Sequence, residues 1–313
     1  MRIVSLLPSA TEIVYALGLE DDLVGVTFEC DEPARARADK AIVVGGRDTS
    51  GLAPAEIDRY VRERMAAGED LYTLHSEALA GLQPELILTQ DLCRVCALPT
   101  DHVEAALDYL GCQADVVSLD PHSLDDVLDT ILEVGRRTGR AEAARRLVDD
   151  LRRRLAAVAD EVAGVLGGRR PPRVAVVEWV DPPFTAGHWV PDLVRAAGGE
   201  PVAATPRGKS VETTWAQIAA AEPDVVVVSP CGFHLDGASE QAALVLDRVG
   251  AGPAVWAIDA DGLVVRPGPR LVDGVEALAS VLHPSYRPLA GAPAVRLIRT
   301  GAAGTSARAG ALP

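Results

Sequence analysis

The chain has 313 residues, of which 48% are hydrophobic and 24% charged, a balance typical of a globular protein with room for two domains. Its formal net charge of −15 argues against a nucleic-acid or anionic-membrane partner, because both favour clustered Lys and Arg. The five cysteines, an odd number, do not suggest a disulfide framework.

The first thirty residues predict a strand, a capped helix and a second strand. The apolar run at residues 3–7 is too short for a signal peptide, because Pro8 ends it. Residues 9–12 (SATE) have the spacing of a capping box, with Ser9 at the N-cap and Glu12 three residues on. Residues 23–27 then predict the second strand. With no lipid-attachment cysteine near the start and no transmembrane run, we expect a cytoplasmic protein with no direct membrane insertion.

Two distant segments share one order of helix, proline and buried strand. They are residues 75–93 and residues 214–231, and their strands ELILT and DVVVV are continuous apolar runs. Such runs are typical of parallel strands covered on both faces. Residues 2–6 and 173–177 form a second matching pair. The sequence therefore predicts an α/β fold of two lobes, each a mostly parallel sheet flanked by helices.

A helical segment lies between the two predicted lobes. Thr138 and Gly139 divide it into one helix ending near Arg136 and a second over residues 140–166. The second would be about 40 Å long, enough to bridge both lobes. We expect an N-terminal lobe at 1–122, connecting helices at 123–167, a C-terminal lobe at 168–285, and a disordered tail at 286–313 rich in Ala, Gly, Pro and Arg.

Aromatic residues gather after the predicted strands of the second lobe. Ligands of open parallel sheets bind beyond the carboxyl ends of the strands, so the loops there are the candidate site. EWVDPPFTAGHW follows the strand at 174–177, PCGFHLDG follows the strand at 224–228, and RPGPR follows a predicted strand at 263–265. In a chain that is only 4% aromatic, these loops favour a large, flat, partly apolar ligand, with core packing as the alternative. The aromatic and histidine residues concerned are Trp179, Phe184, His188, Trp189 and Phe233.

Four cysteines also follow the carboxyl ends of predicted strands. Thiolates at the spacing of Cys93 and Cys96 suit zinc, iron–sulfur clusters or another thiophilic metal, and Cys30 and Cys231 would lie nearby. The chain has no second CxxC motif to complete a structural zinc site. The alternative is that these residues are small buried hydrophobes.

Other polar residues in the loops leave their roles open. His188 and His234 could each ligate a metal or bond a backbone carbonyl. Arg266 and Arg270 could hold a phosphate or carboxylate, with helix capping or an ion pair with Asp273 as the alternatives. The chain has no G-x-S-x-G, Walker or dinucleotide-binding motif, which favours binding over catalysis.

Taken together, five motifs resemble the cobalamin-binding members of the helical-backbone (class III) substrate-binding proteins of ABC importers. The motifs are RIVSLLPSATEIVYALG, LVGVTFECDEP, LILTQDLCRVCAL, VVEWVDPPFTAGHWVPDLVRAAGG and RPGPRLVDGVEAL, and the resemblance runs from about residue 1 to residue 284. It implies two α/β lobes bridged by a helix, with a corrinoid in the cleft. Carried over by position, it implies ligand contacts at Pro8, Ser9, Glu12, Phe28, Glu29, Cys30, Asp31, Trp179, Asp181, Phe184, His188, Trp189, Cys231, Phe233, Arg266 and Arg270.

The chain departs from this family at Phe28, where relatives often have a His. If that His coordinates cobalt in relatives, this protein uses another ligand such as His188 or a cysteine, or none. Because no export signal precedes the first strand, we expect a non-catalytic, monomeric, intracellular corrinoid carrier, store or scavenger. It would pass its cargo to a membrane importer or to a cobalamin-using protein.

Two alternative functions remain. The first is a thiol-dependent metal-binding or corrinoid- or tetrapyrrole-processing protein that uses Cys93 and Cys96 with Cys30 or Cys231. The second is a tetrapyrrole or siderophore receptor whose export signal is encoded upstream of this sequence.

Overall fold

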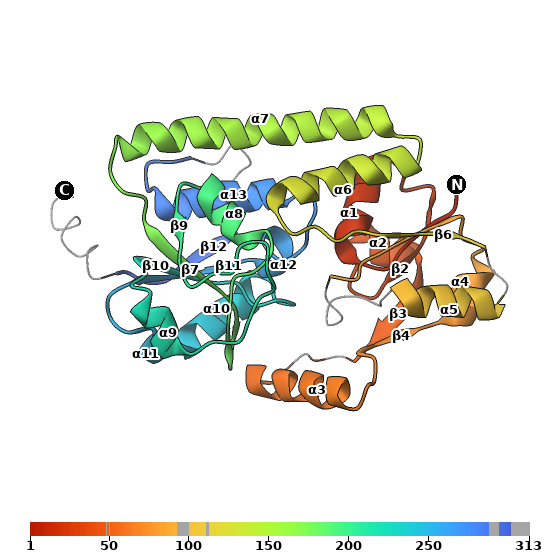
Figure 1. Cartoon of the computed structure of the whole chain (residues 1–313), viewed down its shortest axis with the longest axis horizontal. Helices are drawn as coiled ribbons and strands as arrows, with labels where there is room; N and C mark the ends of the chain where they lie inside the picture. Colours follow the sequence, from red (N-terminus) through yellow and green to blue (C-terminus); the bar gives the residue numbers. More distant parts are fainter. Residues whose placement is uncertain (48, 50, 93–99, 111–112, 288–293, 302–313) are drawn as a thin grey trace. The chain divides into compact units, whose positions relative to one another are not determined.

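A computed structural model describes residues 1–47, 49, 51–92, 100–110, 113–287 and 294–301 (Figure 1). The chain forms two compact units. Unit 1 comprises Met1–Pro121 and Asp125–Asp149, and unit 2 comprises His122–Leu124 and Asp150–Pro313. Each unit has a β-sheet flanked by helices, so the predicted α/β class is confirmed. The finer domain boundaries stay a prediction.

The sheet of unit 1 has six strands in the order β4-β3-β2-β1-β5-β6. All neighbouring strands are parallel except β4, which runs antiparallel to β3. The predicted apolar run ELILT forms β5 of this sheet, and β1 and β5 are buried throughout. The strands are β1 (Ile3–Ser5), β2 (Leu23–Thr27), β3 (Ala41–Gly46), β4 (Tyr72–Leu74), β5 (Leu86–Thr89) and β6 (Asp115–Ser118).

The first helix begins two residues earlier than the predicted capping box requires. The helix α1 starts at Pro8, its N-cap is Leu7, and no side chain caps it. Proline suits a first helical position because it has no N–H to leave unsatisfied. Ser9 and Glu12 therefore lie inside the helix and are buried, so the capping-box prediction was wrong. The helices before the long connection are α1 (Pro8–Ala16), α2 (Arg35–Asp39), α3 (Pro54–Ala66), α4 (Ser76–Gly81) and α5 (Thr100–Leu110).

Two helices follow β6, as the sequence predicts. They are α6 (Leu124–Arg137) and α7 (Ala141–Leu166), and the division between the two units falls within α7. Gly139, with a φ of +71°, ends the first helix at the predicted break. Within the described residues, no helix combines the length and the hydropathy needed to cross a bilayer.

The sheet of unit 2 has the order β12-β11-β10-β7-β8, and β9 pairs with β7. The strands β7, β10 and β11 are parallel, and β8 and β12 are antiparallel to their neighbours. The strands are β7 (Arg173–Val180), β8 (Pro183–Thr185), β9 (Glu200–Pro201), β10 (Val225–Val228), β11 (Ala254–Ile258) and β12 (Val295–Arg299). The helices are α8 (Val190–Ala196), α9 (Trp215–Ala220), α10 (Leu235–Leu244), α11 (Leu246–Val249), α12 (Ala260–Leu263) and α13 (Leu271–Leu282).

The strand β12 corrects the prediction of a disordered tail. It pairs with β11, with Leu297 opposite Trp256 and Val295 opposite Ile258. The arginines that made this segment resemble a tail fix it in place, because Arg296 donates to Asp236 at 2.8 Å and Arg299 donates to the carbonyl of Leu246 at 2.9 Å. These partners are distant in sequence, so composition alone misses them.

The prediction of a strand at residues 263–265 is also wrong. Leu263 ends the short helix α12, and the strand of this region is β11, nine residues earlier at its start. The side chain of Asp259 accepts a hydrogen bond from the N–H of Gly262 at 2.8 Å and so caps α12. That cap converts the expected strand into a helical turn.

Candidate ligand-binding site

In unit 1, four buried polar side chains fix the loops at the carboxyl edge of the sheet, the edge where the parallel strands end. Thr11 Oγ1, on α1, lies 2.9 Å from Ser5 Oγ and 3.1 Å from Cys30 Sγ, and Thr27 Oγ1 lies 3.3 Å from the same sulfur. Cys30 has no exposed surface. Its thiol therefore joins α1 to the end of β2, while the Thr11 hydroxyl joins α1 to the end of β1, and the burial of Cys30 fits the packing alternative.

The residues around Cys30 form a partly accessible surface. Phe28, Glu29 and Asp31 are half-buried. The Phe28 ring packs beside Gly46 of β3, so closely that a β-carbon there would come within 2.7 Å of it. The Tyr72 hydroxyl donates to Glu29 Oε1 at 3.3 Å, and its ring centroid is 6.3 Å from that of Phe28. Tyr72 was missed by the sequence analysis because it lies on the antiparallel edge strand, far along the chain.

The predicted contacts on α1 are less accessible. Ser9 and Glu12 are only 3% and 7% exposed, whereas Pro8 is half-buried. Of these three residues, only Pro8 presents much surface in the structure of unit 1.

In unit 2, three half-buried aromatic rings lie at the carboxyl edge of the sheet. Trp179 on β7 pairs in register with Phe184 on β8, and its ring centroid is 6.0 Å from that of Phe233, which follows β10. The Trp179 Nε1–H donates to the carbonyl of Asp181 at 3.3 Å. The planes of the Trp179 and Phe233 rings are tilted by 53°, so these side chains form an angled apolar surface.

Trp189 belongs to the core instead. It is 6% exposed, and its Nε1–H donates to the carbonyl of Val264 at 2.8 Å. The alternative of core packing therefore holds for this residue.

His188 lies between two other rings. Its ring stacks on that of Trp189 at 5.6 Å between centroids and lies 5.8 Å from that of His122. Burial lowers the pKa of His188, and the neighbouring His122 and Lys209 lower it further. In the described structure its Nε2 is buried without a hydrogen-bond partner. A neutral imidazole with an unused ring nitrogen is a chemically competent metal ligand, but this nitrogen is not exposed.

The arginine loop is organised by Asp261. Arg266 Nη2 lies 3.0 Å from Asp261 Oδ2, and each side chain is 11% exposed. Asp261 also accepts from the N–H of Gly232 at 2.9 Å, beside the exposed Cys231. Asp273, weighed as an alternative partner of these arginines, pairs with Arg154 of α7. Arg270 is the N-cap of α13 and is half-buried.

The metal hypothesis gains no support. Cys93 and Cys96 lie outside the described residues. Among the residues that are described, no three His, Cys, Asp or Glu side chains gather in a way that could hold a metal ion. His234 Nδ1 lies 3.0 Å from Asp259 Oδ1, so an acidic side chain engages this histidine.

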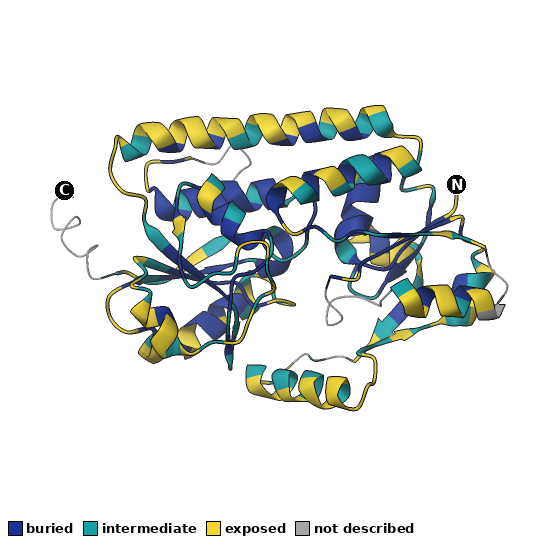
Figure 2. Cartoon of the chain, viewed as in Figure 1, coloured by how far each residue is buried: buried dark blue, intermediate teal, exposed yellow. Residues whose placement is uncertain are grey.

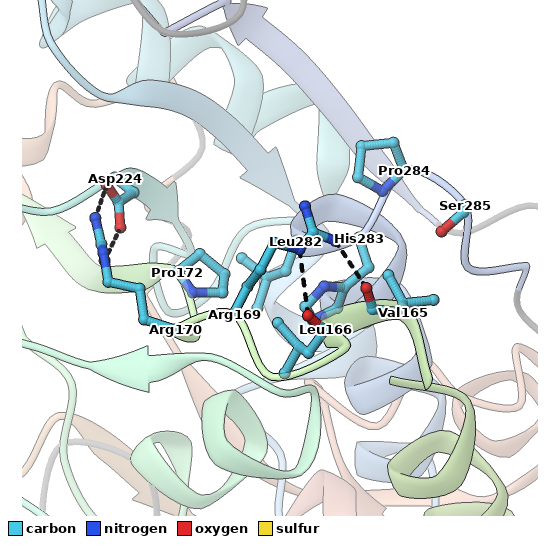
Figure 3. Close-up of a pocket in the computed structure, with 10 residues that line it drawn as sticks. All are labelled: Val165, Leu166, Arg169, Arg170, Pro172, Asp224, Leu282, His283, Pro284 and Ser285. Carbon is cyan, nitrogen blue, oxygen red and sulfur yellow. Dashed lines mark hydrogen bonds and ion pairs between the residues drawn. The ribbon is translucent and has the colours of Figure 1, made fainter. Parts of the chain in front are cut away.

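Figure 3 shows a cavity of about 560 Å³ at the opposite, amino-terminal edge of the sheet in unit 2. Its cations are already engaged. Arg170 forms two bonds with Asp224, at 2.8 and 3.0 Å, and lowers the pKa of that carboxyl. Arg169 donates to the carbonyls of Val165 and Leu166 at the end of α7. None of the predicted site residues lines this cavity.

The fold and the two loop clusters define a binding protein, and comparison with known proteins identifies its class. A family model described as periplasmic binding protein matches residues 3–260. The chain therefore belongs to the periplasmic binding protein family. Members that serve ABC importers bind a small-molecule ligand without catalysing a reaction on it, and they work with a membrane importer.

Two relatives extend over most of the chain. The vitamin B12-binding protein of Vibrio cholerae is 26% identical over 291 residues, which cover 90% of this chain and 88% of that protein. An uncharacterised ABC transporter substrate-binding lipoprotein of Bacillus subtilis is 28% identical over 291 residues, covering 90% of this chain and 80% of the relative.

Two solved structures have the same fold. The periplasmic vitamin B12 binding protein of Vibrio cholerae matches with a TM-score of 0.60 and 25% identity, over 90% of this chain and 96% of the other. A periplasmic haem binding protein from Pseudomonas aeruginosa matches with a TM-score of 0.71 and 24% identity, over 96% of this chain and 99% of the other, which shows the fold alone.

These comparisons overturn the predicted cytoplasmic location. The family is one of periplasmic binding proteins, and the relatives described above are periplasmic or are lipoproteins. The prediction relied on the first residues alone, which do not decide where a protein of this family works. The intracellular store and the handover to a cobalamin-using protein depended on that location and are withdrawn with it. That the protein is a monomer stays a prediction.

Proposed function

We propose that the protein is a substrate-binding protein for a corrinoid, which it delivers to an ABC importer. The observation that carries this proposal is the group of three half-buried rings of Trp179, Phe184 and Phe233 at the carboxyl edge of the sheet in unit 2. A corrinoid has a broad, flat macrocycle, and aromatic side chains provide large contact areas for such a ligand. Similarity to vitamin B12-binding proteins over 90% of the chain supports the same ligand class.

We propose two groups of ligand contacts, one on each unit. Those on unit 1 are the accessible residues Pro8, Phe28, Glu29 and Asp31. Those on unit 2 are Trp179, Asp181, Phe184, Cys231, Phe233 and Arg270. The remaining predicted residues act from behind this surface: Ser9, Glu12, Cys30 and Trp189 are buried, the Nε2 of His188 is buried, and Arg266 is held by Asp261.

Haem is the second candidate, because one of the structural neighbours described above is a haem binding protein. Haem iron requires an axial protein ligand such as His, Cys, Met or Tyr. In the described loops His188 has an unpartnered ring nitrogen, but that nitrogen is buried, and the Tyr72 hydroxyl is bonded to Glu29. The exposed Cys231 is a third candidate axial ligand in these loops. The preference for a corrinoid over haem therefore rests on the similarity to vitamin B12-binding proteins.

A visible-absorbance titration with hydroxocobalamin, repeated with haemin, tests the proposal. We expect saturable one-to-one binding of hydroxocobalamin and weaker, unsaturated binding of haemin. In the double variant Trp179→Ala/Phe233→Ala the affinity for hydroxocobalamin should fall roughly tenfold or more, because about 1.4 kcal/mol of lost contact energy suffices for a factor of ten.

The matched control is Trp215→Ala, which removes a half-buried indole on α9, outside the candidate loops. Its affinity should equal that of the unmodified protein. Haemin binding that is tighter than cobalamin binding, and that His188→Ala abolishes, would replace the corrinoid proposal with the haem alternative.

A further inference from the structure

The helix α3 is unusual among the helices of the described chain because none of its 13 residues is buried. Every other described helix has at least one buried residue. Along the chain, α3 connects β3 to β4, two strands that pair with each other in antiparallel orientation. Figure 2 shows this helix in the colours of exposed and intermediate residues only. Helices are usually stabilised by packing an apolar face, and the core of unit 1 does not use this one.

The helix nevertheless has well-defined ends. Pro54 occupies its first turn, and Glu56 Oε2 accepts a hydrogen bond from the N–H of Ala53 at 2.9 Å. At the other end, Gly68 has a φ of +70° and its N–H donates to the carbonyl of Met65 at 3.1 Å. The sequence therefore specifies this helix in spite of its missing core contacts.

One face of α3 is apolar. Ile57, Tyr60 and Val61 share that face, because residues three and four apart are neighbours on a helix, and all three are half-buried. We call these three residues the α3 stripe. The guanidinium of Arg47 lies over the Tyr60 ring, 4.4 Å from its centroid, so a cation covers one face of this ring. The other face carries exposed residues such as Arg59 and Glu63.

The segment that carries α3 begins and ends beside Phe28 and Glu29, in the candidate ligand loop of unit 1. The segment leaves β3 at Gly46, which packs beside the Phe28 ring. It returns at Tyr72, whose hydroxyl bonds Glu29 and whose ring lies beside that of Phe28. The two ends of this segment, which lie outside the helix itself, thus contact Phe28 and Glu29, two of the proposed ligand contacts.

We propose that the α3 stripe is a further contact surface for the bound corrinoid, continuous with the surface at Phe28 and Glu29. This inference rests on the proposed function. A macrocycle with apolar faces and a polar rim matches an aliphatic and aromatic stripe with an arginine beside it. Ligand contact also accounts for a well-capped amphipathic helix whose apolar face contributes nothing to the core.

The experiment compares the full-length protein with two variants of α3. The stripe variant is Ile57→Ala/Tyr60→Ala/Val61→Ala, and the control is Arg59→Ala/Glu63→Ala on the exposed face. Neither variant changes the net charge, and alanine favours the helix. Hydroxocobalamin affinity is measured by calorimetry, amide hydrogen exchange is followed over residues 54–66, and oligomeric state is measured by light scattering.

We expect the stripe variant to bind hydroxocobalamin at least about tenfold more weakly, while the control stays within twofold of the unmodified protein. Ligand should slow amide exchange in α3 of the unmodified protein and of the control, but not in the stripe variant. Equal affinity of the stripe variant and the unmodified protein would overturn this inference and leave the proposed function intact. The inference would also be overturned if the unmodified protein and the control form dimers and the stripe variant does not. That result would show that the stripe contacts a second copy of the protein. If the unmodified protein does not bind hydroxocobalamin, the proposed function fails, and this inference fails with it.

Discussion

At the scale of single residues, the cysteines of the two units have different environments. Cys30 is fully buried against the hydroxyls of Thr11 and Thr27, whereas Cys231 is exposed at the end of β10. Removing a buried hydrogen-bonding group leaves its partners unsatisfied, which costs about 1–3 kcal/mol. Removing an exposed thiol leaves no buried partner unsatisfied and therefore has no such cost in stability.

We therefore expect Cys30→Ala to lower the free energy of unfolding by about 1–3 kcal/mol and Cys231→Ala to change it by less than about 0.5 kcal/mol. Urea unfolding of both variants under reducing conditions measures these changes. Equal stabilities for the two variants would show that the contacts of Cys30 with Thr11 and Thr27 do not stabilise the fold.

The buried histidines of unit 2 give stability a pH dependence. Burial lowers the pKa of both His188 and His283 from the ordinary value of 6.5. As the pH falls below about 6.5, the unfolded chain therefore binds protons before the folded chain does. Their contribution to stability is complete above that pH and is lost progressively as the pH falls toward the lowered values in the folded state.

We expect the free energy of unfolding to be nearly constant from pH 8 to 7 and to fall between pH 6.5 and 5.5, by at most about 1.4 kcal/mol per pH unit for each histidine. Urea unfolding at several pH values measures this slope, and His188→Gln should reduce it. His102→Gln is the control, because His102 is 41% exposed. A slope that is identical in all three proteins would contradict this explanation.

At the scale of elements, a partly buried ionic cluster joins α7 to α13 within unit 2. Arg154 on α7 bonds both Asp273 and Glu276, and the Glu276 side chain is 1% exposed. Asp273 and Glu276 raise the pKa of Arg154 against the opposing effect of burial. Because the cation compensates a buried carboxylate, its loss costs more than the loss of a surface ion pair.

We expect Arg154→Ala to lower the free energy of unfolding by roughly 2–4 kcal/mol. The neighbouring Arg153 is the matched control: its side chain is 71% exposed and pairs with Asp150 on the same helix. Arg153→Ala should cost less than about 0.5 kcal/mol. Similar stabilities of the two variants, measured by urea unfolding, would show that the cluster does not hold α13 to α7.

The elements also show how far sequence patterns predict this fold. The apolar runs of β5 and β10 and the glycine break before α7 were predictable, because each follows from neighbouring residues. The strand β12 and the helix α12 were not. The strand β12 depends on the bond between Arg296 and Asp236, which are sixty residues apart in the chain. The helix α12 depends on the cap from Asp259, which opposes a local sequence pattern that favours a strand.

The candidate site was predictable to a similar extent. The sequence predicts Phe28 and Trp179 directly after strands, and both are partly accessible. Phe28 does follow β2, whereas Trp179 lies within β7, which extends to Val180. It did not reveal the role of Thr11, which depends on α1 packing over β2, or that of Tyr72, which depends on an edge strand 43 residues from Glu29. Local spacing also could not distinguish Trp189, which is buried, from Trp179, because both lie in one loop sequence.

At the scale of the whole molecule, ligand binding and stability are linked. The chain belongs to a family of small-molecule binding proteins, so saturation with the correct ligand should stabilise the folded state. At a free hydroxocobalamin concentration 100 times its Kd, we expect the free energy of unfolding to rise by about 2.7 kcal/mol. Thermal unfolding with and without the ligand measures this effect. A transition temperature unchanged by cobalamin but raised by haemin would contradict the corrinoid proposal.

The most direct test of the central claim is a calorimetric and visible-absorbance titration of the purified protein with hydroxocobalamin. We predict saturable one-to-one binding at micromolar concentrations or below, with a change in the cobalt spectrum or a measurable heat, and a clear loss of affinity in Trp179→Ala/Phe233→Ala. No heat and no spectral change at micromolar concentrations would contradict it, and the protein would then be a binding protein for a different small molecule.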